Sequence, residues 1–225
     1  MDNEITFEEL KSMIAAKAVL FDVRTPQEIK ESGGLDDSVN VPIDEVRTAF
    51  QSSPSDFKLK YGVPLPGKDT LIVFYCLSGK RSLRAVNVVK EMRFNNARYY
   101  PGGFSKYTEL VSEEINAQEL QRLLGIDEVK LFDVRTPKEI QEIGKIEGST
   151  NIPIDQIKEA FQLDEKEFGE KYGATIPKKT DKNIVFYCGS GKRSRRAIDY
   201  VKEFGYSARH YPYGYRKYVE ELNAK

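Results

Sequence analysis

The feature that most constrains this chain is an internal repeat. Residues 20–26 (LFDVRTP) return unchanged as residues 131–137, a shift of 111 residues. Residues 73–76 (VFYC) return as residues 185–188, a shift of 112 residues. A period of about 110 residues is far longer than a solenoid unit and has the length of one small domain. The sequence therefore predicts two tandem domains of the same kind. We expect them to be residues 1–111 and residues 112–225.

The composition excludes several classes of protein. Of the 225 residues, 40% are hydrophobic and 31% are charged, which is enough apolar material for a core. There are 35 basic and 35 acidic residues, so the chain has no net charge to attract nucleic acid or anionic lipid. No stretch approaches the roughly 20 apolar residues of a membrane span. We therefore expect no nucleic-acid partner and no membrane association.

The cysteines, the histidine and the N-terminus bear on cofactors and location. Two cysteines and one histidine are too few for a disulfide-stapled secreted fold or a four-ligand zinc site. The first residues, Met1, Asp2, Asn3 and Glu4, lack the basic and apolar regions of a signal peptide. We expect a cytoplasmic protein with no metal and no other cofactor.

Each half alternates predicted strands with predicted helices. Short runs rich in apolar, β-branched and aromatic residues predict strands that are buried on both faces. Because parallel strands need long crossovers, helices between successive strands imply a mainly parallel sheet with helices on both faces. We therefore expect an α/β fold in each domain. The predicted strands are residues 19–23, 71–75, 129–134 and 184–187.

Capping residues mark where helices begin. Thr25 and Glu28 have the spacing of a capping box, with a proline between them at the first helical position. Thr136 and Glu139 repeat this pattern in the second half. By the preference of aspartate for N-caps, two further residues are predicted to cap the next helices. They are Asp44 and Asp155.

Both cysteines lie at the same place in the repeat, directly after the most apolar strand. In a parallel α/β sheet, ligands bind beyond the carboxyl ends of the strands, where the next helix directs its N-terminus. A thiol there is expected to have a lowered pKa, and neighbouring lysine and arginine favour the thiolate further. Successive loop amides can also surround an anion. The first loop is Cys76, Leu77, Ser78, Gly79, Lys80, Arg81 and Ser82; the second is Cys188, Gly189, Ser190, Gly191, Lys192, Arg193 and Ser194.

These loops have two other possible interpretations. A free cysteine is often only a small buried hydrophobe, but the occurrence of both cysteines in matching loops disfavours simple packing. The Gly-Lys pair also suggests a nucleotide-binding P-loop. That motif needs a glycine five residues earlier, where this chain has Phe74 and Phe186. We therefore interpret Cys76 and Cys188 as nucleophiles inside pockets for a small oxyanion.

The chain resembles the rhodanese family of sulfurtransferases over both halves. Short segments before, within and after each cysteine loop carry the resemblance. They are residues 22–24, 40–42, 76–82 and 100–104, and in the second half residues 133–135, 151–153, 188–194 and 211–215. The resemblance implies that Cys76 and Cys188 are catalytic and that the other loop residues bind the substrate. Each cysteine would take sulfane sulfur as a persulfide and pass it to an acceptor nucleophile.

The distance from the Asn-x-Pro segment to the cysteine is most similar to that of small cytosolic thiosulfate sulfurtransferases. This resemblance implies thiosulfate as the donor and a thiol such as glutathione or thioredoxin, or cyanide, as the acceptor. Position 77 is leucine whereas position 189 is glycine, so we expect a narrower mouth at the first loop and slower use of bulky acceptors there. Both halves are expected to be catalytic.

Two other functions stay open at this point. One is a sulfur-carrier or interaction module without turnover of its own. The other is a cysteine phosphatase or arsenate reductase of related fold. Four residues lie between each cysteine and its arginine, one fewer than in the phosphatases of related fold, and a shorter ring favours a smaller species than phosphate.

Several residues outside the loops are predicted to be structural. Asp22 with Arg24, and Asp133 with Arg135, are expected to form strand-end ion pairs or hydrogen bonds, because a buried charge needs a partner. His210 has no partner at metal-ligand spacing, so a strand-end or surface role is expected. A tyrosine cluster is expected to pack in the core or at its rim, with an acceptor groove as the alternative. Its members are Tyr211, Tyr213, Tyr215 and Tyr218.

Overall fold

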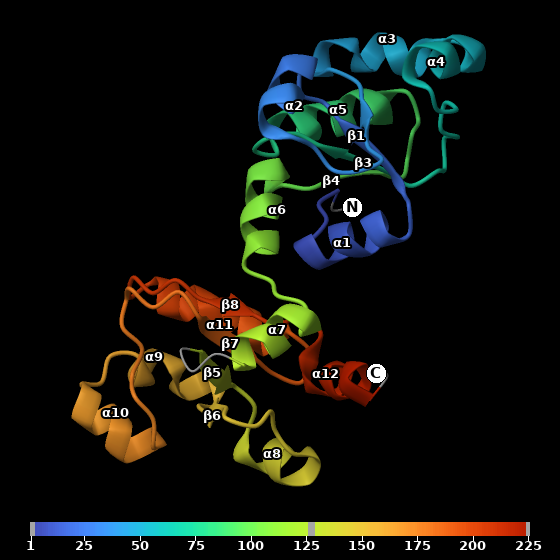
Figure 1. Ribbon diagram of the computed structural model, residues 1–225. Helices are drawn as coiled ribbons and strands as arrows, with labels where there is room; N and C mark the ends of the chain where they lie inside the picture. The colour runs from blue at the N-terminus through green and yellow to red at the C-terminus, as the bar shows by residue number, and fades with distance from the viewer. Residues whose placement is uncertain (1–2, 126–128, 224–225) are drawn as a thin grey trace. The chain divides into compact units, whose positions relative to one another are not determined.

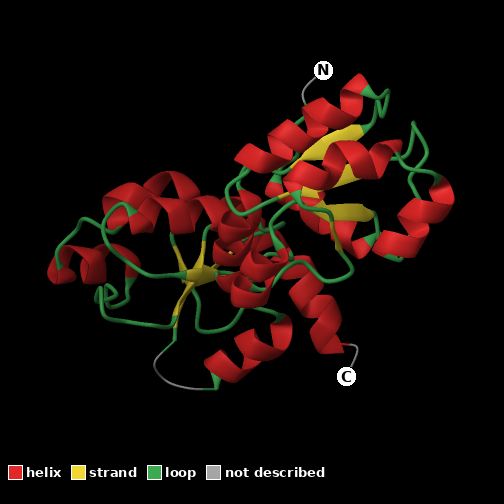
Figure 2. Ribbon diagram, turned by 90° about the horizontal axis from the view of Figure 1, so that it is seen from above, coloured by secondary structure: helices red, strands yellow, loops and turns green. Residues whose placement is uncertain are grey.

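The computed structural model describes residues 3–125 and 129–223 (Figure 1). The chain divides into two compact units, Met1–Leu110 and Val111–Lys225. Each unit contains one four-stranded sheet with helices on both faces, so the predicted α/β fold is confirmed for both (Figure 2). No helix within these two described ranges is long and apolar enough to span a membrane.

The first unit begins with a helix and then alternates strands and helices. In chain order its elements are α1 (Phe7–Ala15), β1 (Val19–Asp22), α2 (Pro26–Ser32), β2 (Val39–Asn40), the 3-10 helix η1 (Ile43–Glu45), α3 (Val46–Gln51), α4 (Pro54–Tyr61), β3 (Ile72–Tyr75), α5 (Lys80–Glu91), β4 (Ala97–Tyr99) and α6 (Gly103–Ser112).

The second unit repeats the same order of elements. They are α7 (Ala117–Leu124), β5 (Lys130–Asp133), α8 (Pro137–Ile143), β6 (Thr150–Asn151), the 3-10 helix η2 (Ile154–Gln156), α9 (Ile157–Ala160), α10 (Glu165–Tyr172), β7 (Ile184–Tyr187), α11 (Lys192–Lys202), β8 (Arg209–His210) and α12 (Gly214–Asn223).

Both sheets are parallel throughout. The strand order is β2-β1-β3-β4 in the first unit and β6-β5-β7-β8 in the second. The strands that precede the cysteines, β3 and β7, therefore lie in the interior of their sheets, and all four residues of each are buried. In a sheet of this kind the carboxyl ends of the central strands form the edge where ligands bind. Both cysteine loops begin at this edge.

Alternate residues of each strand face two separate apolar clusters. In the first unit Phe21 and Phe74 pack with residues of α3, α4 and α5. Leu20 and Val73 face the opposite side, where they pack with residues of α1 and α6. The second unit has the same division, with Phe132 and Phe186 in one cluster and Leu131 and Val185 in the other. This two-residue alternation explains why the strands read as continuous apolar runs: both faces are covered.

The capping predictions are confirmed for α2 and α8 and wrong for the aspartates. The side chains of Thr25 and Thr136 each accept a hydrogen bond from the glutamate three residues on, and the reciprocal bond completes both capping boxes. Asp44 and Asp155 instead lie inside the 3-10 helices η1 and η2, and the α-helices that follow have no side-chain cap. The reason is that each 3-10 helix begins directly after the proline at position 42 or 153, ahead of the aspartate.

Candidate active site

Each cysteine lies in a tight turn between a buried strand and a helix. Cys76 directly follows β3, and α5 begins four residues later at Lys80; Cys188 stands in the same relation to β7 and to Lys192 of α11. The side chains of both cysteines are buried. The N-caps of α5 and α11 are glycines, which have no side chain to occupy the first-turn N–H groups. The positive end of the helix and its free amides therefore face the loop.

The second thiol accepts a backbone hydrogen bond inside its loop. The Gly191 N–H donates to Cys188 Sγ over 3.1 Å. Cys188 Sγ also lies 3.7 Å from the hydroxyl oxygen of Ser194, and Cys76 Sγ lies 3.8 Å from that of Ser82. Both serines are fully buried. The serine at the end of each loop thus has its hydroxyl in contact with the sulfur.

Each loop is held by close approach of its glycine to the backbone of the final turn. Gly79 and Gly191 adopt left-handed backbone angles, with φ of 85° and 83°. A Cβ atom added to Gly79 would lie 2.1 Å from the carbonyl oxygen of Pro101, and one on Gly191 would lie 1.9 Å from that of Pro212. Only glycine fits at these positions. The loop and the final turn are therefore in direct backbone contact.

A glycine of the final turn makes a matching close approach to the backbone of each cysteine loop. A Cβ atom on Gly103 would lie 2.3 Å from the Leu77 carbonyl oxygen, and one on Gly214 would lie 2.1 Å from that of Gly189. The amide that follows each glycine donates to the cysteine carbonyl, over 2.7 Å to Cys76 and 2.8 Å to Cys188. Sequence reasoning did not identify Gly103 and Gly214 as supports of the loop. The signal was present, because glycine is kept at this place in both copies although its neighbours differ.

The loop arginines are bound by the capping glutamates. Arg81 donates through both terminal nitrogens to Glu28, over 2.7 and 2.6 Å, and Arg193 does the same to Glu139, over 2.6 Å twice. Hydrogen bonds from the arginine are the main reason why the pKa of each glutamate is lowered to about 2. The sequence predicted these glutamates only as caps. They also orient the arginines, which are therefore not free cations beside the sulfur.

The remaining loop residues differ in exposure. The lysines Lys80 and Lys192 are exposed, as are the serines Ser78 and Ser190. The Leu77 side chain is 40% exposed. Gly189, at the corresponding place in the second loop, is half-buried, and a Cβ atom there would lie 3.3 Å from Arg193 Nη2. A side chain at this position therefore starts beside the arginine–glutamate pair.

The aspartate–arginine pairs are structural, as the sequence predicted. Arg24 contacts Asp22 over 2.5 Å and Arg135 contacts Asp133 over 2.6 Å, with all four side chains buried. Each guanidinium also stacks on an aromatic ring of the last helix of its unit, at 4.6 Å for Phe104 and 4.3 Å for Tyr215. These rings stand directly after Gly103 and Gly214, so the pairs stabilise the turn that supports the cysteine loop.

His210 and the tyrosines occupy buried and rim positions. His210 is in β8 and is buried, which agrees with the strand-end role, and its Nδ1 lies 3.1 Å from the Ser194 hydroxyl oxygen. Tyr211 and Tyr218 are buried in the core of the second unit, whereas Tyr213 is 53% exposed. Packing, the favoured interpretation, accounts for the buried tyrosines. The contact of His210 with the loop serine was not predicted.

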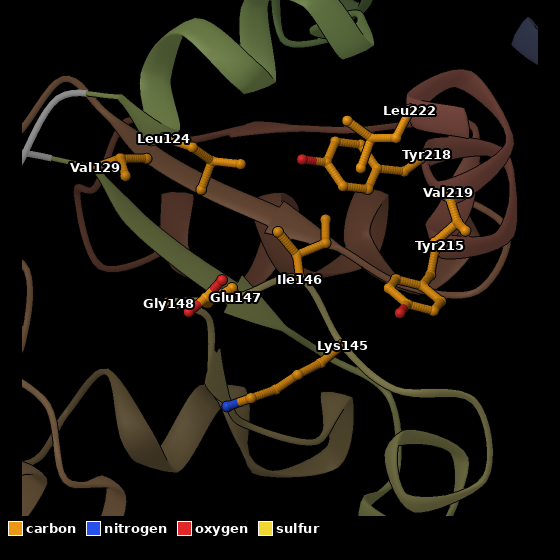
Figure 3. Close-up of a pocket in the computed structure, with 10 residues that line it drawn as sticks. All are labelled: Leu124, Val129, Lys145, Ile146, Glu147, Gly148, Tyr215, Tyr218, Val219 and Leu222. Atoms are coloured by element: carbon orange, nitrogen blue, oxygen red, sulfur yellow. The ribbon is translucent and has the colours of Figure 1, made fainter. Parts of the chain in front are cut away.

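A separate cavity lies on the side of the second unit covered by α7 and α12. It has a volume of about 600 Å³, and Figure 3 shows Ile146 between Leu124 and Tyr215 on its walls. Its lining includes no residue of the Cys188 loop. Within residues 3–125 and 129–223, no group of three or more histidine, cysteine, aspartate or glutamate side chains is arranged to hold a metal ion.

The fold and the site together define a class of protein. Its members are parallel α/β units with a buried cysteine in the loop between a central strand and the next helix. A family model for the rhodanese-like domain matches residues 6–110 and, separately, residues 116–221. The chain therefore belongs to the rhodanese-like family, with two such domains in tandem.

Two curated relatives each match about one domain's length of this chain. Thiosulfate sulfurtransferase/rhodanese-like domain-containing protein 3 of Mus musculus is 43% identical over 112 residues, which cover 49% of this chain and 71% of that protein. Thiosulfate:glutathione sulfurtransferase of Homo sapiens is 36% identical over 108 residues, 48% of this chain and 93% of that protein. A solved human single-domain sulfurtransferase is 35% identical, with a TM-score of 0.47, and covers 48% of this chain and 96% of its own.

Proposed function

We propose that each unit transfers sulfane sulfur from thiosulfate to a small nucleophile, with Cys76 and Cys188 as the carriers. The observation that supports this most directly is the placement of each sulfur. It is buried at the carboxyl end of a central strand, faces the N-terminus of the next helix and, at Cys188, accepts a loop amide over 3.1 Å. The thiolate is the nucleophilic form of a cysteine.

The first half of the reaction is a displacement at sulfur. The cysteine thiolate donates an electron pair to the outer sulfur of thiosulfate, forming a Sγ–S bond. The original S–S bond breaks, and sulfite leaves with its electron pair. The proposed role of the loop is to hold the developing negative charge with its amides, which are fixed before the reaction by the glycine contacts with the final turn.

The second half returns the cysteine to its starting state. The acceptor, a thiolate or cyanide, attacks the outer sulfur of the persulfide. The Sγ–S bond breaks, and the cysteine leaves as a thiolate, so no metal or redox cofactor is needed. This chain is similar to human thiosulfate:glutathione sulfurtransferase, and we therefore propose glutathione as a thiol acceptor. Thioredoxin and cyanide are the other acceptors of the proposal, and a cytoplasmic location remains a prediction from sequence.

The loop residues divide into two proposed roles. Gly79, Gly191 and their neighbours supply backbone amides to the bound sulfur. Arg81 and Arg193 contribute a charge whose position is set by a carboxylate, and the exposed lysines Lys80 and Lys192 attract the dianionic donor toward the loop. Ser82 and Ser194 contact the sulfur from the helix side.

Intact-mass measurement after incubation with thiosulfate tests the proposal. We expect a gain of one sulfur atom per working cysteine, reversed by added glutathione with release of the thiol persulfide. The variants Cys76→Ala and Cys188→Ala assign each gain to its loop, and the double variant must gain none. Absence of any gain in the unmodified chain would refute turnover and favour a carrier or interaction module. Hydrolysis of an aryl phosphate by the same preparation would favour the phosphatase alternative.

A further inference from the structure

A groove lies between α8 and α12 in the second unit. It has a volume of about 320 Å³, which is within the range of small-ligand sites. Its lining residues are Ile143, at the end of α8, and Tyr215, Arg216, Val219 and Glu220 of α12. Figure 3 shows Tyr215 and Val219 one above the other, because residues four apart share a face of a helix. The groove therefore combines an apolar wall with two charged residues.

Both walls of the groove begin at the Cys188 loop. The backbone N–H of Tyr215 donates to the Cys188 carbonyl oxygen over 2.8 Å. On the other wall, a carboxylate oxygen of Glu139 lies 3.8 Å from the place that a Cβ atom on Gly189 would take. Ile143 is one helical turn beyond Glu139, which is about 6 Å along the helix axis. The groove therefore starts about one turn of helix from the loop that carries the sulfur.

Arg216 supplies the groove with a positive charge that a ligand can use. The Glu220 carboxylate pairs with Lys217 over 3.4 Å. Across the described part of the chain, no carboxylate forms an ion pair with Arg216, whose side chain is exposed. A guanidinium holds a carboxylate through two parallel hydrogen bonds, a geometry that a lysine ammonium does not match. The charge of the groove is thus complementary to a carboxylate on the ligand.

Ile143 leaves a buried arginine without one of its partners. In the first unit, Nη1 of Arg24 donates to Ser32 Oγ at the end of α2 over 2.8 Å. The matching residue in the second unit is Ile143, and Nη1 of the buried Arg135 has no hydrogen-bond partner among the described residues. Ile143 is 40% exposed, so packing returns little for the lost bond. An unpaired buried donor weakens a fold, and such departures are expected at functional sites.

The first unit lacks this combination of residues. The shift of 111 residues that relates the two halves puts serine or threonine where the groove has isoleucine, arginine and valine. The three residues are Ser32, Ser105 and Thr108. None of them carries a charge or a large apolar side chain. The first unit is therefore an internal control for ligand binding to the groove.

We propose that this groove binds the sulfur acceptor of the second unit, and that the acceptor is a small thiol that carries a carboxylate. The carboxylate pairs with Arg216, the carbon chain lies against Ile143 and Val219, and the thiol lies toward the Cys188 loop. Three extended residues span about 10 Å, so a peptide thiol of the glutathione kind can reach from the groove to the loop. The inference rests on the proposed function in identifying the ligand as the acceptor.

NMR titration of the full chain with S-methylglutathione tests binding without sulfur transfer. This thioether keeps both carboxylates of glutathione but has no thiol, so it cannot accept sulfur. We expect amide shifts to change along α8 and α12 and not along α2 and α6. The diethyl ester of the same compound has no carboxylate and should bind about three- to fivefold more weakly, the effect of one exposed ion pair. Equal affinity for the two compounds would overturn the proposal.

Three variants assign the binding to the groove. Arg216→Ser introduces the residue of the first unit and should weaken binding of S-methylglutathione about three- to fivefold, to the level of the ester. Ile143→Ser should also weaken binding, yet without loss of stability in urea, because the new hydroxyl can accept from Arg135. Lys166→Ser removes an exposed cation from α10, which packs on the other face of the sheet, and should leave binding unchanged. Unchanged binding in Arg216→Ser, or an equal loss in Lys166→Ser, would overturn the proposal.

Sulfur discharge separates this inference from the proposed function. Cys188 is loaded with thiosulfate in the Cys76→Ala variant, and loss of the loaded sulfur to added glutathione is followed by intact mass. Arg216→Ser should require about three- to fivefold more glutathione for half-maximal discharge, at an unchanged maximum rate. A lower maximum rate with the same concentration dependence would overturn the inference. Absence of loading would refute the sulfurtransferase proposal, and the NMR titration would still decide whether the groove binds the ligand.

Discussion

Gly191→Ala should release the second cysteine loop from its support. The new Cβ would lie 1.9 Å from the Pro212 carbonyl oxygen, so loop or turn must move by about 1 Å to reach even the 3.0 Å of a tight contact. The left-handed φ of 83° adds a cost of about 1–2 kcal/mol for any residue with a Cβ. Backbone shifts forced by overpacking cost about 1–3 kcal/mol more. We expect a total loss of about 2–5 kcal/mol in the stability of the second unit.

Gly173→Ala is the matched control for the backbone angle. Gly173 has φ of 65° at the end of α10, and nothing lies within 4 Å of the position of its Cβ. This variant should show the conformational cost alone, about 1–2 kcal/mol, and should keep its activity. The difference between the two variants in urea unfolding therefore measures the contact with Pro212. Gly79→Ala and Gly62→Ala form the same pair in the first unit, with φ of 85° and 76°.

Sulfur loading of each cysteine reports the functional consequence. A displacement of about 1 Å in a catalytic loop can reduce a rate by roughly 100-fold. We expect Gly191→Ala to slow loading of Cys188 by about that factor and to leave Cys76 unaffected in the same molecule. Loading of Cys188 at the normal rate in a folded Gly191→Ala protein would refute the idea that the proline turn holds the loop in position.

Three further predictions concern the groups around the loops. The lowered pKa of Glu28 and Glu139, about 2, means that their ion pairs stabilise the folded state fully above pH 4.5, and this contribution is lost as the pH falls toward 2. Because the carboxylates are one-third exposed, each pair is expected to contribute only about 1 kcal/mol to the stability of the folded state. Urea unfolding of the double variant Glu28→Gln/Glu139→Gln tests this. The variant should be less stable than the unmodified chain at pH 6 and equal to it near pH 2. Arg193→Ala should slow sulfur loading of Cys188 by roughly 100-fold. Arg193→Lys should restore only part of the loading rate, since a lysine cannot match the two-nitrogen contact with Glu139. Full recovery of the rate with lysine would show that charge alone matters. In a Cys188→Ala background, Leu77→Gly should raise glutathione-dependent turnover severalfold and change cyanide-dependent turnover little. The reason is that the Leu77 side chain is 40% exposed at the loop surface, where it can obstruct a bulky acceptor. Equal effects on both acceptors would contradict a steric role of Leu77.

Much of this architecture was predictable because it is encoded over short distances in the chain. The repeat indicated two domains of one kind, and the apolar runs indicated strands buried on both faces. Thr25 with Glu28 predicted a helix start through contacts that span only three residues. The cysteine loops could be placed because a strand, a turn and a helix follow one another directly. The Asp44 prediction failed on a local competition, since a 3-10 helix forms first after Pro42.

The contacts that define the site join segments far apart in the chain, and only the tertiary structure decides them. Glu28 meets Arg81 across 53 residues, and the sequence alone shows the first as a cap and the second as a free cation. The glycine of each loop meets a proline turn more than twenty residues on, where a missing Cβ matters only because two backbones cross there. His210 reaches Ser194 because β8 lies beside β7 and α11 packs on them. Local patterns set which elements form, and the packing of those elements sets which side chains meet.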